Sequence, residues 1–311
     1  MQITASMVKE LRELSGAGMS ACKNALVEAS GDLKRAIEIL REKGLAAAAK
    51  KAGRIAAEGL VATAMSADGK KGAIVEVNSE TDFVAKNEDF VSFVKQVAVE
   101  ALNSDVSTVD ALLEQKWTLD TAQTVKDVLA NKVATIGENI SIRRFEKYEA
   151  GGRIVDYIHG GGRIGVMLEI TATDINDAVI EAGRNICMQI AAMSPRYIDR
   201  SEVSAEYLAN EKEILTQHAI NENAEAEKPK PPQVLEKNLD KIVEGRLSKQ
   251  LEDICLLDQE YVKEDKKTVA EYLKSVGSGT KIVRFTRYEK GEGIEKKEED
   301  FAAEVQKAMK V

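Results

Sequence analysis

A short segment places apolar residues inside an otherwise polar connection. Residues 81–87 read Thr-Asp-Phe-Val-Ala-Lys-Asn and join a strand-like segment to a helix-like one. Phe83 can pack back onto its own domain as a hydrophobic staple, or it can point outward as an aromatic anchor for a crevice in a partner protein. The corresponding connection later in the chain, Thr173-Asp174-Ile175, enters its helix without an aromatic residue. This difference favours the anchor.

A second segment of this kind lies near the N-terminus. Residues 15–19 read Ser-Gly-Ala-Gly-Met, so Gly16 and Gly18 leave the backbone accessible and Met19 supplies an adaptable side chain. The segment is either an ordinary turn between helices with Met19 in the core, or a second contact surface. The sequence leaves both interpretations open.

Motifs that would support catalysis are few. The sequence contains no P-loop, no HExxH and no Cys/His cluster with metal-ligand spacing, and its two histidines, His159 and His218, are typical of structural or surface residues. Residues 160–165 match the pattern GxGxxG, but a dinucleotide site requires that this pattern link a strand to a helix. The residues that follow, 164–170, are strand-like, which favours a hairpin turn. We therefore predict that the chain is not an enzyme and needs no cofactor.

Composition and charge favour a protein that binds other proteins in the cytoplasm. The 311 residues include 52 acidic and 44 basic side chains, for a formal net charge of −8. Nucleic-acid binding needs a concentrated basic surface; the sequence has no dense basic stripe, so we expect no direct nucleic-acid contact. An odd number of widely spaced cysteines favours a reducing compartment. No signal peptide or membrane-spanning stretch is present, so we expect a cytoplasmic protein without membrane contact.

The first 54 residues are predicted to form three short helices. Asp32 is the expected N-cap of the third helix and Gly44 its expected end. Three sets of apolar residues at helical spacing carry this prediction: Val8, Leu11 and Leu14; Met19, Cys22, Leu26 and Ala29; and Leu33, Ile37 and Leu40.

A hairpin followed by a helix is predicted twice in the rest of the chain. The first copy has strands at 60–65 and 72–77 and a helix at 88–102, and the second has strands at 154–159 and 164–170 and a helix at 175–193. A further repeat, Arg-Phe-x-x-Tyr-Glu-x-Gly-x-x-Ile, begins at Arg144 and again at Arg284. It predicts equivalent strands in two related sheets.

Between these two strands lies a predicted antiparallel helical hairpin. The loop 221–232 is polar and carries three of the four prolines, which cannot continue a helix. Narrow apolar seams with charged flanks predict a projecting coiled coil. The seam residues are Tyr207, Ile214 and His218, with Leu208, Leu215 and Ala219 beside them, and then Leu235, Leu239 and Ile242. The tail, from Phe301 to Met309, is predicted to form a short amphipathic helix.

The chain resembles the elongation factor Ts family in motifs spread along nearly its whole length. The N-terminal motif is Gly16-Ala-Gly-Met19 with Cys22-Lys23-x-Ala25-Leu26, and the second is Thr81-Asp-Phe-Val-Ala-Lys-Asn87. The other matching segments are Gly137-Glu-Asn-Ile140, Arg143-Arg144, His159-Gly160, Arg163-Ile-Gly165, Glu244-Gly245-Arg246 and Gly291-Glu-Gly-Ile-Glu295. Motifs this specific, in this order, are typical of the family.

The resemblance implies an α+β fold with an insertion. A ubiquitin-associated-like three-helix domain (1–54) precedes the core, which consists of two related hairpin-plus-helix subdomains. The core N-subdomain covers 55–140, and the core C-subdomain covers 141–200 and 252–290. The antiparallel coiled-coil insertion covers 201–251, and a C-terminal helical module covers 291–311.

The resemblance also implies a function in translation: binding of GDP-bound elongation factor Tu and exchange of its GDP for GTP. In the family, the motif formed here by Asp82, Phe83, Val84, Ala85 and Lys86 enters near the magnesium site of the partner. The N-terminal domain, here with Gly18 and Met19, and the C-terminal module hold the partner's nucleotide-binding domain. Some relatives form a homodimer through the coiled-coil insertion; the proline-rich loop 221–232 departs from the family pattern, which leaves a homodimer open.

Two other functions remain as alternatives. A ubiquitin-associated-like adaptor would act through residues 1–54, without exchange activity, and would have no need of Phe83. An enzyme that used the glycine turn at 160–165 would bind a nicotinamide cofactor.

Overall fold

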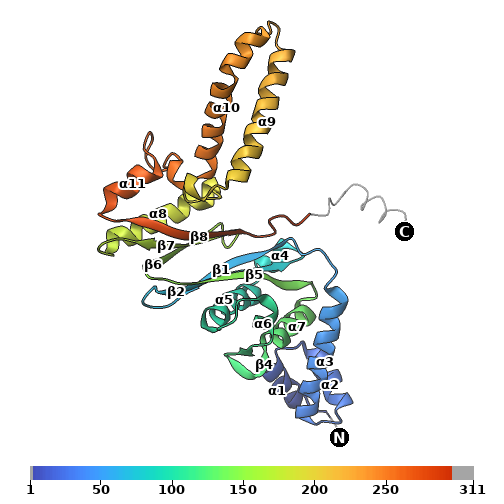
Figure 1. Ribbon diagram of the computed structural model, residues 1–311. Helices are drawn as coiled ribbons and strands as arrows, with labels where there is room; N and C mark the ends of the chain where they lie inside the picture. Colours follow the sequence, from blue (N-terminus) through green and yellow to red (C-terminus); the bar gives the residue numbers. More distant parts are fainter. Residues whose placement is uncertain (1–2, 296–311) are drawn as a thin grey trace. The chain divides into compact units, whose positions relative to one another are not determined.

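The N-terminal sequence folds into three helices, and the third begins at its predicted N-cap. The computed structural model describes residues 3–295, and its first elements are α1 (Ala5–Ser15), α2 (Met19–Glu28) and α3 (Leu33–Lys51) (Figure 1). The side chain of Asp32 accepts a hydrogen bond from the Arg35 backbone, which starts α3. The helices close around a small core: Val8, Leu11, Cys22, Ala25, Leu26, Ala29, Ala36, Ile39 and Leu40.

Two details of this domain differ from the prediction. Gly44 does not end α3, which continues to Lys51. Gly44 is instead buried within the helix, where an added Cβ would lie 3.0 Å from Asn131 Oδ1, so the glycine permits close approach of a second helix. Leu14 and Ile37 are exposed and lie outside the core, because a domain this small buries only one narrow face of each helix.

The first hairpin-plus-helix unit forms as predicted. β1 (Glu58–Met65) and β2 (Lys71–Ser79) pair antiparallel, with Leu60 opposite Val77, and β5 (Ile140–Glu149) pairs with the other edge of β2. α5 (Glu88–Asn103) packs on β1 and β2. The segment between α5 and β5, to which the sequence analysis assigned no structure, forms α6 (Val109–Leu113), β3 (Lys116–Trp117), β4 (Asp120–Thr124) and α7 (Val125–Ile136).

The second copy has the same topology. β6 (Arg153–His159) and β7 (Ile164–Thr171) form a hairpin, and β8 (Lys281–Glu289) pairs with β7 as β5 pairs with β2. α8 (Asp177–Met193) follows β7, as a helix follows β2 in the first copy. The α+β class is therefore confirmed, and the strands that begin near Arg144 and Arg284 occupy the same place in their two sheets.

Each compact unit of the structure contains short segments that belong, in sequence, to the other copy. Residues 1–149, 158–165 and those from 288 onward form one compact unit, and residues 150–157 and 166–287 form the other. In the first unit, buried Glu76 pairs with Arg144 (2.6 Å) and accepts a hydrogen bond from Gly291 N (2.7 Å). In the second unit, buried Glu169 pairs with Arg284 (2.8 Å) and accepts from Gly152 N (3.2 Å). Glu76 of the first sheet thus fixes the turn after β8, and Glu169 of the second sheet fixes the turn after β5.

The insertion is a helical hairpin of α9 (Ala205–Glu225) and α10 (Pro232–Ile254), which projects from the second unit (Figure 1). Its seam buries Leu215 and Ala219 against Val243, Leu247 and Leu251. Of the two rows predicted on α9, the row with Ile214 and His218 faces outward, so that assignment is wrong. The short helices η1 (Arg200–Glu202), η2 (Leu256–Asp258) and α11 (Val269–Val276) complete the second unit.

Several predictions are not decided by these elements. The predicted helix at 301–309, and most of the predicted module 291–311, lie outside the described residues. The ubiquitin-associated-like and coiled-coil descriptions, and the domain boundaries themselves, stay predictions.

Candidate partner-binding site

Residues 82–85 form a one-turn helix that presents Phe83 to solvent. This helix, α4 (Asp82–Ala85), begins at Thr81, whose side chain accepts a hydrogen bond from Val84 N. Val84 and Ala85 are buried in the core of the first sheet, whereas Phe83 is 79% exposed. The sequence predicts only a polar connection between strand and helix here, so the short helix is an addition. The hydrophobic-staple interpretation of Phe83 is wrong, because the ring does not pack on its own domain.

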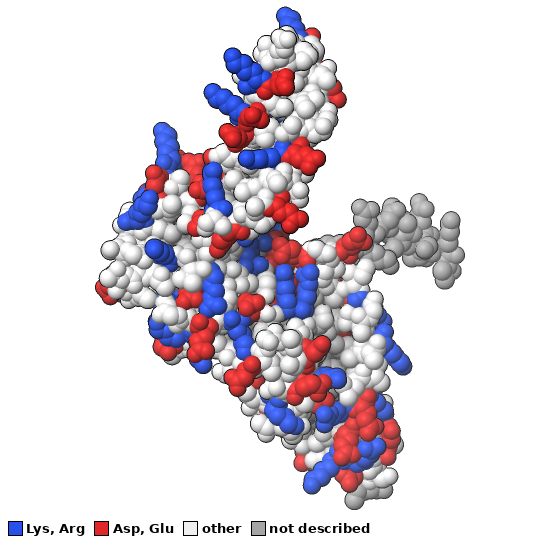
Figure 2. Space-filling view, in the orientation of Figure 1, with Lys and Arg blue, Asp and Glu red and all other residues white. Residues whose placement is uncertain are grey.

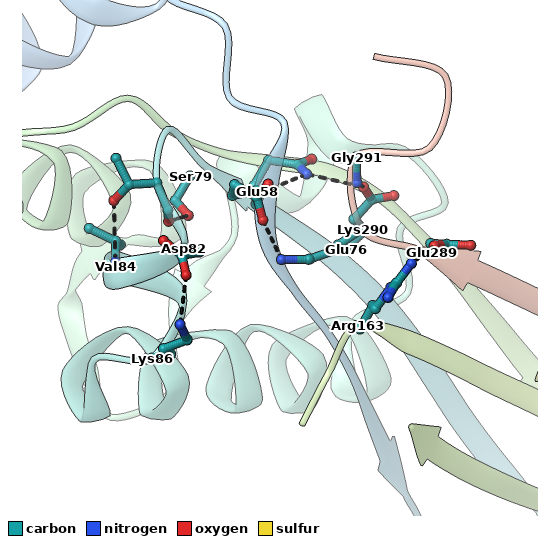
Figure 3. Close-up of polar contacts among 12 residues, drawn as sticks. Glu58, Glu76, Ser79, Asp82, Val84, Lys86, Arg163, Glu289, Lys290 and Gly291 are labelled. Atoms are coloured by element: carbon teal, nitrogen blue, oxygen red, sulfur yellow. Dashed lines mark hydrogen bonds and ion pairs between the residues drawn. The ribbon is translucent and has the colours of Figure 1, made fainter. Parts of the chain in front are cut away.

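Asp82 and Lys86 flank the aromatic ring with opposite charges. Lys86 Nζ lies 2.6 Å from Asp82 Oδ2, one helical turn away (Figure 3). The hydrogen bond from Lys86 holds the pKa of the Asp82 carboxyl below its ordinary value. Both side chains are substantially exposed. The segment therefore offers a partner an ionised carboxylate directly beside an exposed aromatic ring.

Hydrogen bonds to the carboxylate of Glu138 fix the start of α4. It follows α7 and Gly137, whose φ of +89° ends that helix. Its carboxylate accepts hydrogen bonds from the backbone N–H of Glu80 (3.1 Å), the N–H of Thr81 (3.0 Å) and the Thr81 hydroxyl (2.7 Å). In the sequence, Glu138 stands out only as part of the family motif at 137–140. No local pattern signals its role, because its partners lie more than fifty residues earlier in the chain.

A recess of mixed charge lies beside Asp82. It has a volume of about 630 Å³ and is lined by Glu58, Asp82, Arg163, Glu289, Lys290, Gly291 and Glu292. Lys290 forms an ion pair with Glu58, and Arg163 Nη2 lies 3.3 Å from Glu289 Oε1 (Figure 3). The positive charge of Lys290 also helps to lower the pKa of Asp82. The turn after β8 therefore contributes to the electrostatic surroundings of α4.

The second predicted contact segment is also accessible. Gly18 is the N-cap of α2, and an added Cβ there would meet no atom within 4 Å. Met19 is 47% exposed, so the interpretation that places it in the core is wrong. Gly18 and Met19 lie in the same compact unit as α4.

The glycine turn is not a dinucleotide site. Gly160, Gly161 and Gly162 all have positive φ, and strand β7 follows them instead of a helix. Within residues 3–295, no group of three or more His, Cys, Asp or Glu side chains is arranged to hold a metal ion. Every helix in that range is too short or too polar to cross a membrane. On the face drawn in Figure 2, Lys and Arg side chains are interspersed with Asp and Glu.

Comparisons with known proteins agree with the motifs. The family model described as elongation factor TS matches residues 80–292, which include α4, α7 and the turn after β8.

The chain belongs to the elongation factor Ts family.

Curated members of the elongation factor Ts family match over nearly the whole chain. The protein named elongation factor Ts in Clostridioides difficile (strain 630) is 52% identical over 313 residues, 99% of each chain. That of Clostridium perfringens (strain 13 / Type A) is 52% identical over 310 residues, 98% of each chain. That of Clostridium acetobutylicum is 50% identical over 312 residues, 99% of this chain and 98% of the relative. Membership in the elongation factor Ts family gives this chain a role as a translation elongation factor.

Proposed function

We propose that this chain binds the GDP-bound form of elongation factor Tu in the cytoplasm and promotes release of GDP and its exchange for GTP. The observation that supports this proposal most strongly is Phe83, which is exposed although a dedicated network holds the helix that carries it. An adaptor that acted only through residues 1–54 would have no use for this arrangement.

Exchange of this kind is thermodynamic coupling between two ligands of one protein. The exchange factor and GDP each weaken the binding of the other by the same factor. A shift of about ten-thousandfold requires about 5.5 kcal/mol of differential binding. The chain itself needs no covalent step and no bound nucleotide.

Phe83 can supply a large part of this free energy but not all of it. Burying about 150–250 Å² of a phenylalanine at about 25 cal/mol per Å² gives about 4–6 kcal/mol before losses. Association and side-chain ordering consume much of that gain. Additional contacts must therefore contribute, and the exposed pair Gly18 and Met19 is the strongest candidate on the N-terminal domain.

Asp82 gives the contact its chemical character. Its carboxylate is ionised at neutral pH and lies beside the anchoring ring. When the ring enters a crevice near the magnesium and phosphate groups of the partner, this negative charge approaches the phosphates and competes for their positive partners. Val84 and Ala85 hold the backbone of the segment in the core of the first unit.

Release of labelled GDP tests the proposal directly. Elongation factor Tu loaded with fluorescent GDP is mixed with excess unlabelled GDP, with and without this chain at about one-tenth of the partner's concentration. We expect release to be accelerated and the whole population to turn over, because the exchange factor is recycled. If a cognate elongation factor Tu releases GDP at the same rate with and without the chain, the proposed function is wrong.

A further inference from the structure

Helix α7 is tied at its two ends to the two segments that the proposed function places on the partner. It contains 12 residues, so its length is about 18 Å at 1.5 Å per residue. Its first turn is bonded to the N-terminal three-helix domain through α3. The residue that follows its C-terminal glycine is bonded to the start of α4.

The first tie is a bidentate ion pair on a buried carboxylate. Arg41 Nε and Nη2, on α3, each lie 2.7 Å from an oxygen of Asp127 in the first turn of α7. Asp127 is buried, and Thr124 donates to it from both its backbone N–H and its hydroxyl. A forked, charge-assisted pair of this kind fixes direction as well as distance.

Close packing extends the contact between α3 and α7, hereafter the joint, along α3. Gly44 lies against α7, where an added Cβ would lie 3.0 Å from Asn131 Oδ1 and 3.7 Å from the backbone of Ala130. One turn further along, Ala48 packs on the core of the first sheet. At the end of α3, Lys51 Nζ donates to the carbonyl of Val133 at 3.3 Å. Contacts spread over this length prevent the N-terminal domain from swivelling about a single point.

The second tie is the Glu138 carboxylate described above. It accepts two backbone N–H groups and one hydroxyl at the N-cap of α4, which directly precedes Asp82 and Phe83. Asn139 reinforces it, because its backbone N–H donates to Glu80 and its side chain donates to the carbonyl of Arg54 at 2.8 Å. The connection that leaves α3 and the turn that starts α4 are therefore bonded to the same few residues.

We propose that α7 is a strut that fixes the spacing between the Met19 segment and the Phe83 segment, so that one partner molecule engages both at once. Arg41 and Glu138 are its positioning residues. This inference rests on the proposed function and adds a role for residues outside the contact segments. A rigid link makes the second contact effectively intramolecular, whereas a loose link lowers its effective concentration.

The spacing itself is measurable without a partner. Val27 on α2 and Phe83 on α4 are exposed, whereas the three native cysteines are buried, so Val27→Cys and Phe83→Cys accept spin labels selectively. Pulsed dipolar spectroscopy should give one narrow distance distribution in the otherwise native chain. Arg41→Gln and Glu138→Ala should each broaden it. A native distribution as broad as that of the variants would overturn the strut.

Matched control variants test whether a broader distance distribution is specific to loss of the Arg41 and Glu138 contacts, or follows from any change of a charged residue. Arg35 lies on α3 like Arg41, but it pairs with Glu38 and Glu42 of its own helix. Glu114 is an exposed glutamate that pairs only at the surface, with Lys126. Arg35→Gln and Glu114→Ala should leave the distance distribution narrow. Equal broadening by the controls would show that the two ties have no special role.

Exchange kinetics then test the functional consequence in unlabelled protein. Arg41→Gln should raise the half-saturating concentration of the chain about tenfold, because part of the effective concentration is lost, with a maximal release rate within twofold of native. Glu138→Ala should instead lower the maximal rate, since α4 would no longer be held in place. In a Met19→Ala background, the effect of Arg41→Gln should largely disappear. A native chain without exchange activity would refute the proposed function and leave the distance result intact; native activity with no effect of either variant would refute the inference.

Discussion

At the scale of single residues, Phe83 and Phe90 show how one side-chain type serves opposite purposes seven residues apart in the same unit. Phe90 is completely buried in the core of the first sheet, whereas Phe83 is 79% exposed on α4. The difference follows from the backbone: Val84 and Ala85 occupy the inward face of the single turn, so Phe83 must face outward. An exposed aromatic ring on a rigid turn is an economical anchor, because little conformational freedom remains to be lost on binding.

Phe83→Ala should therefore separate exchange from stability. We expect GDP release to slow by about 30-fold, which corresponds to a binding hot spot of about 2 kcal/mol. The free energy of unfolding in urea should change by less than about 0.5 kcal/mol, as for an exposed side chain. Phe90→Ala is the matched control and should lose about 3–5 kcal/mol of stability. A comparable loss for Phe83→Ala would mean that this ring is part of the core.

The exposure of Phe83 was predictable from the sequence, but the hydrogen bonds to Glu138 that hold its helix were not. The second copy of the hairpin-plus-helix unit lacks an aromatic residue at the corresponding connection, and that internal comparison pointed to an outward-facing ring, as the structure has it. Glu138 could not be found in this way, since its hydrogen-bond partners are 57 and 58 residues away. Side chains that act through long-range contacts leave no local spacing pattern.

At the scale of elements, the joint between α3 and α7 depends on a charged carboxyl. Burial would raise the pKa of Asp127, but the hydrogen bonds from Thr124 and Arg41 outweigh it, so that the pKa lies below its ordinary value. Because the folded pKa is the lower one, the joint contributes its full stability above the unfolded pKa of about 3.9. That contribution is lost as the pH falls through the folded value.

Asp127→Asn should accordingly make the free energy of unfolding depend less on pH at the acidic end of the range. Between pH 6 and the acid limit, the native chain should lose on the order of 1–2 kcal/mol more than the variant. The measurement is the free energy of urea unfolding as a function of pH. Asp110→Asn, at an exposed position in the first turn of α6, should keep the native slope. Parallel profiles for the native chain and Asp127→Asn would contradict the assignment.

Element prediction succeeded where periodicity and turn residues agree, and failed where tertiary contacts decide. The two hairpins and α5 and α8 were predicted to within a few residues, because alternation, glycine turns and helical spacing all pointed the same way. Gly44 was misread as a helix end, since its real function, close approach to α7, depends on a helix about 80 residues later. Ile214 and His218 on α9 were predicted for the seam together with the buried row of Leu215 and Ala219, because both rows have helical spacing and only the partner helix selects between them.

At the scale of the whole molecule, the α9–α10 hairpin is separable from the proposed exchange site, which lies entirely in the other unit. Its base is bonded into the second unit, where Arg196 and Tyr197 donate to the carbonyl of Ile254. Its outer part exposes Ile214, Ile220 and Val234, which are apolar. We propose that this outer part serves assembly, through a second copy of the chain.

Replacing residues 209–246 with a short Gly/Ser linker tests that separation. The retained base keeps Val203, Leu247, Leu251 and Cys255, so the second unit should stay folded. We expect a maximal GDP-release rate within about twofold of native, and loss of any self-association seen by multi-angle light scattering. A native hairpin with its loop residues changed to Gly/Ser serves as the control. A well-folded shortened chain with a much lower maximal rate would place the hairpin in the exchange mechanism.

The exchange of turns between the two sheets also sets the order in which the chain can mature on the ribosome. Glu169 meets Gly152 only 17 residues away, so the second unit acquires its turn as soon as that segment emerges. Glu76 meets Gly291 across 215 residues. At 5–20 residues per second, that gap corresponds to about 10–40 s of synthesis. Until then, Glu76 has Arg143 and Arg144 as partners but lacks its last hydrogen bond. The first half of this translation factor is thus completed only when almost all of it has been translated.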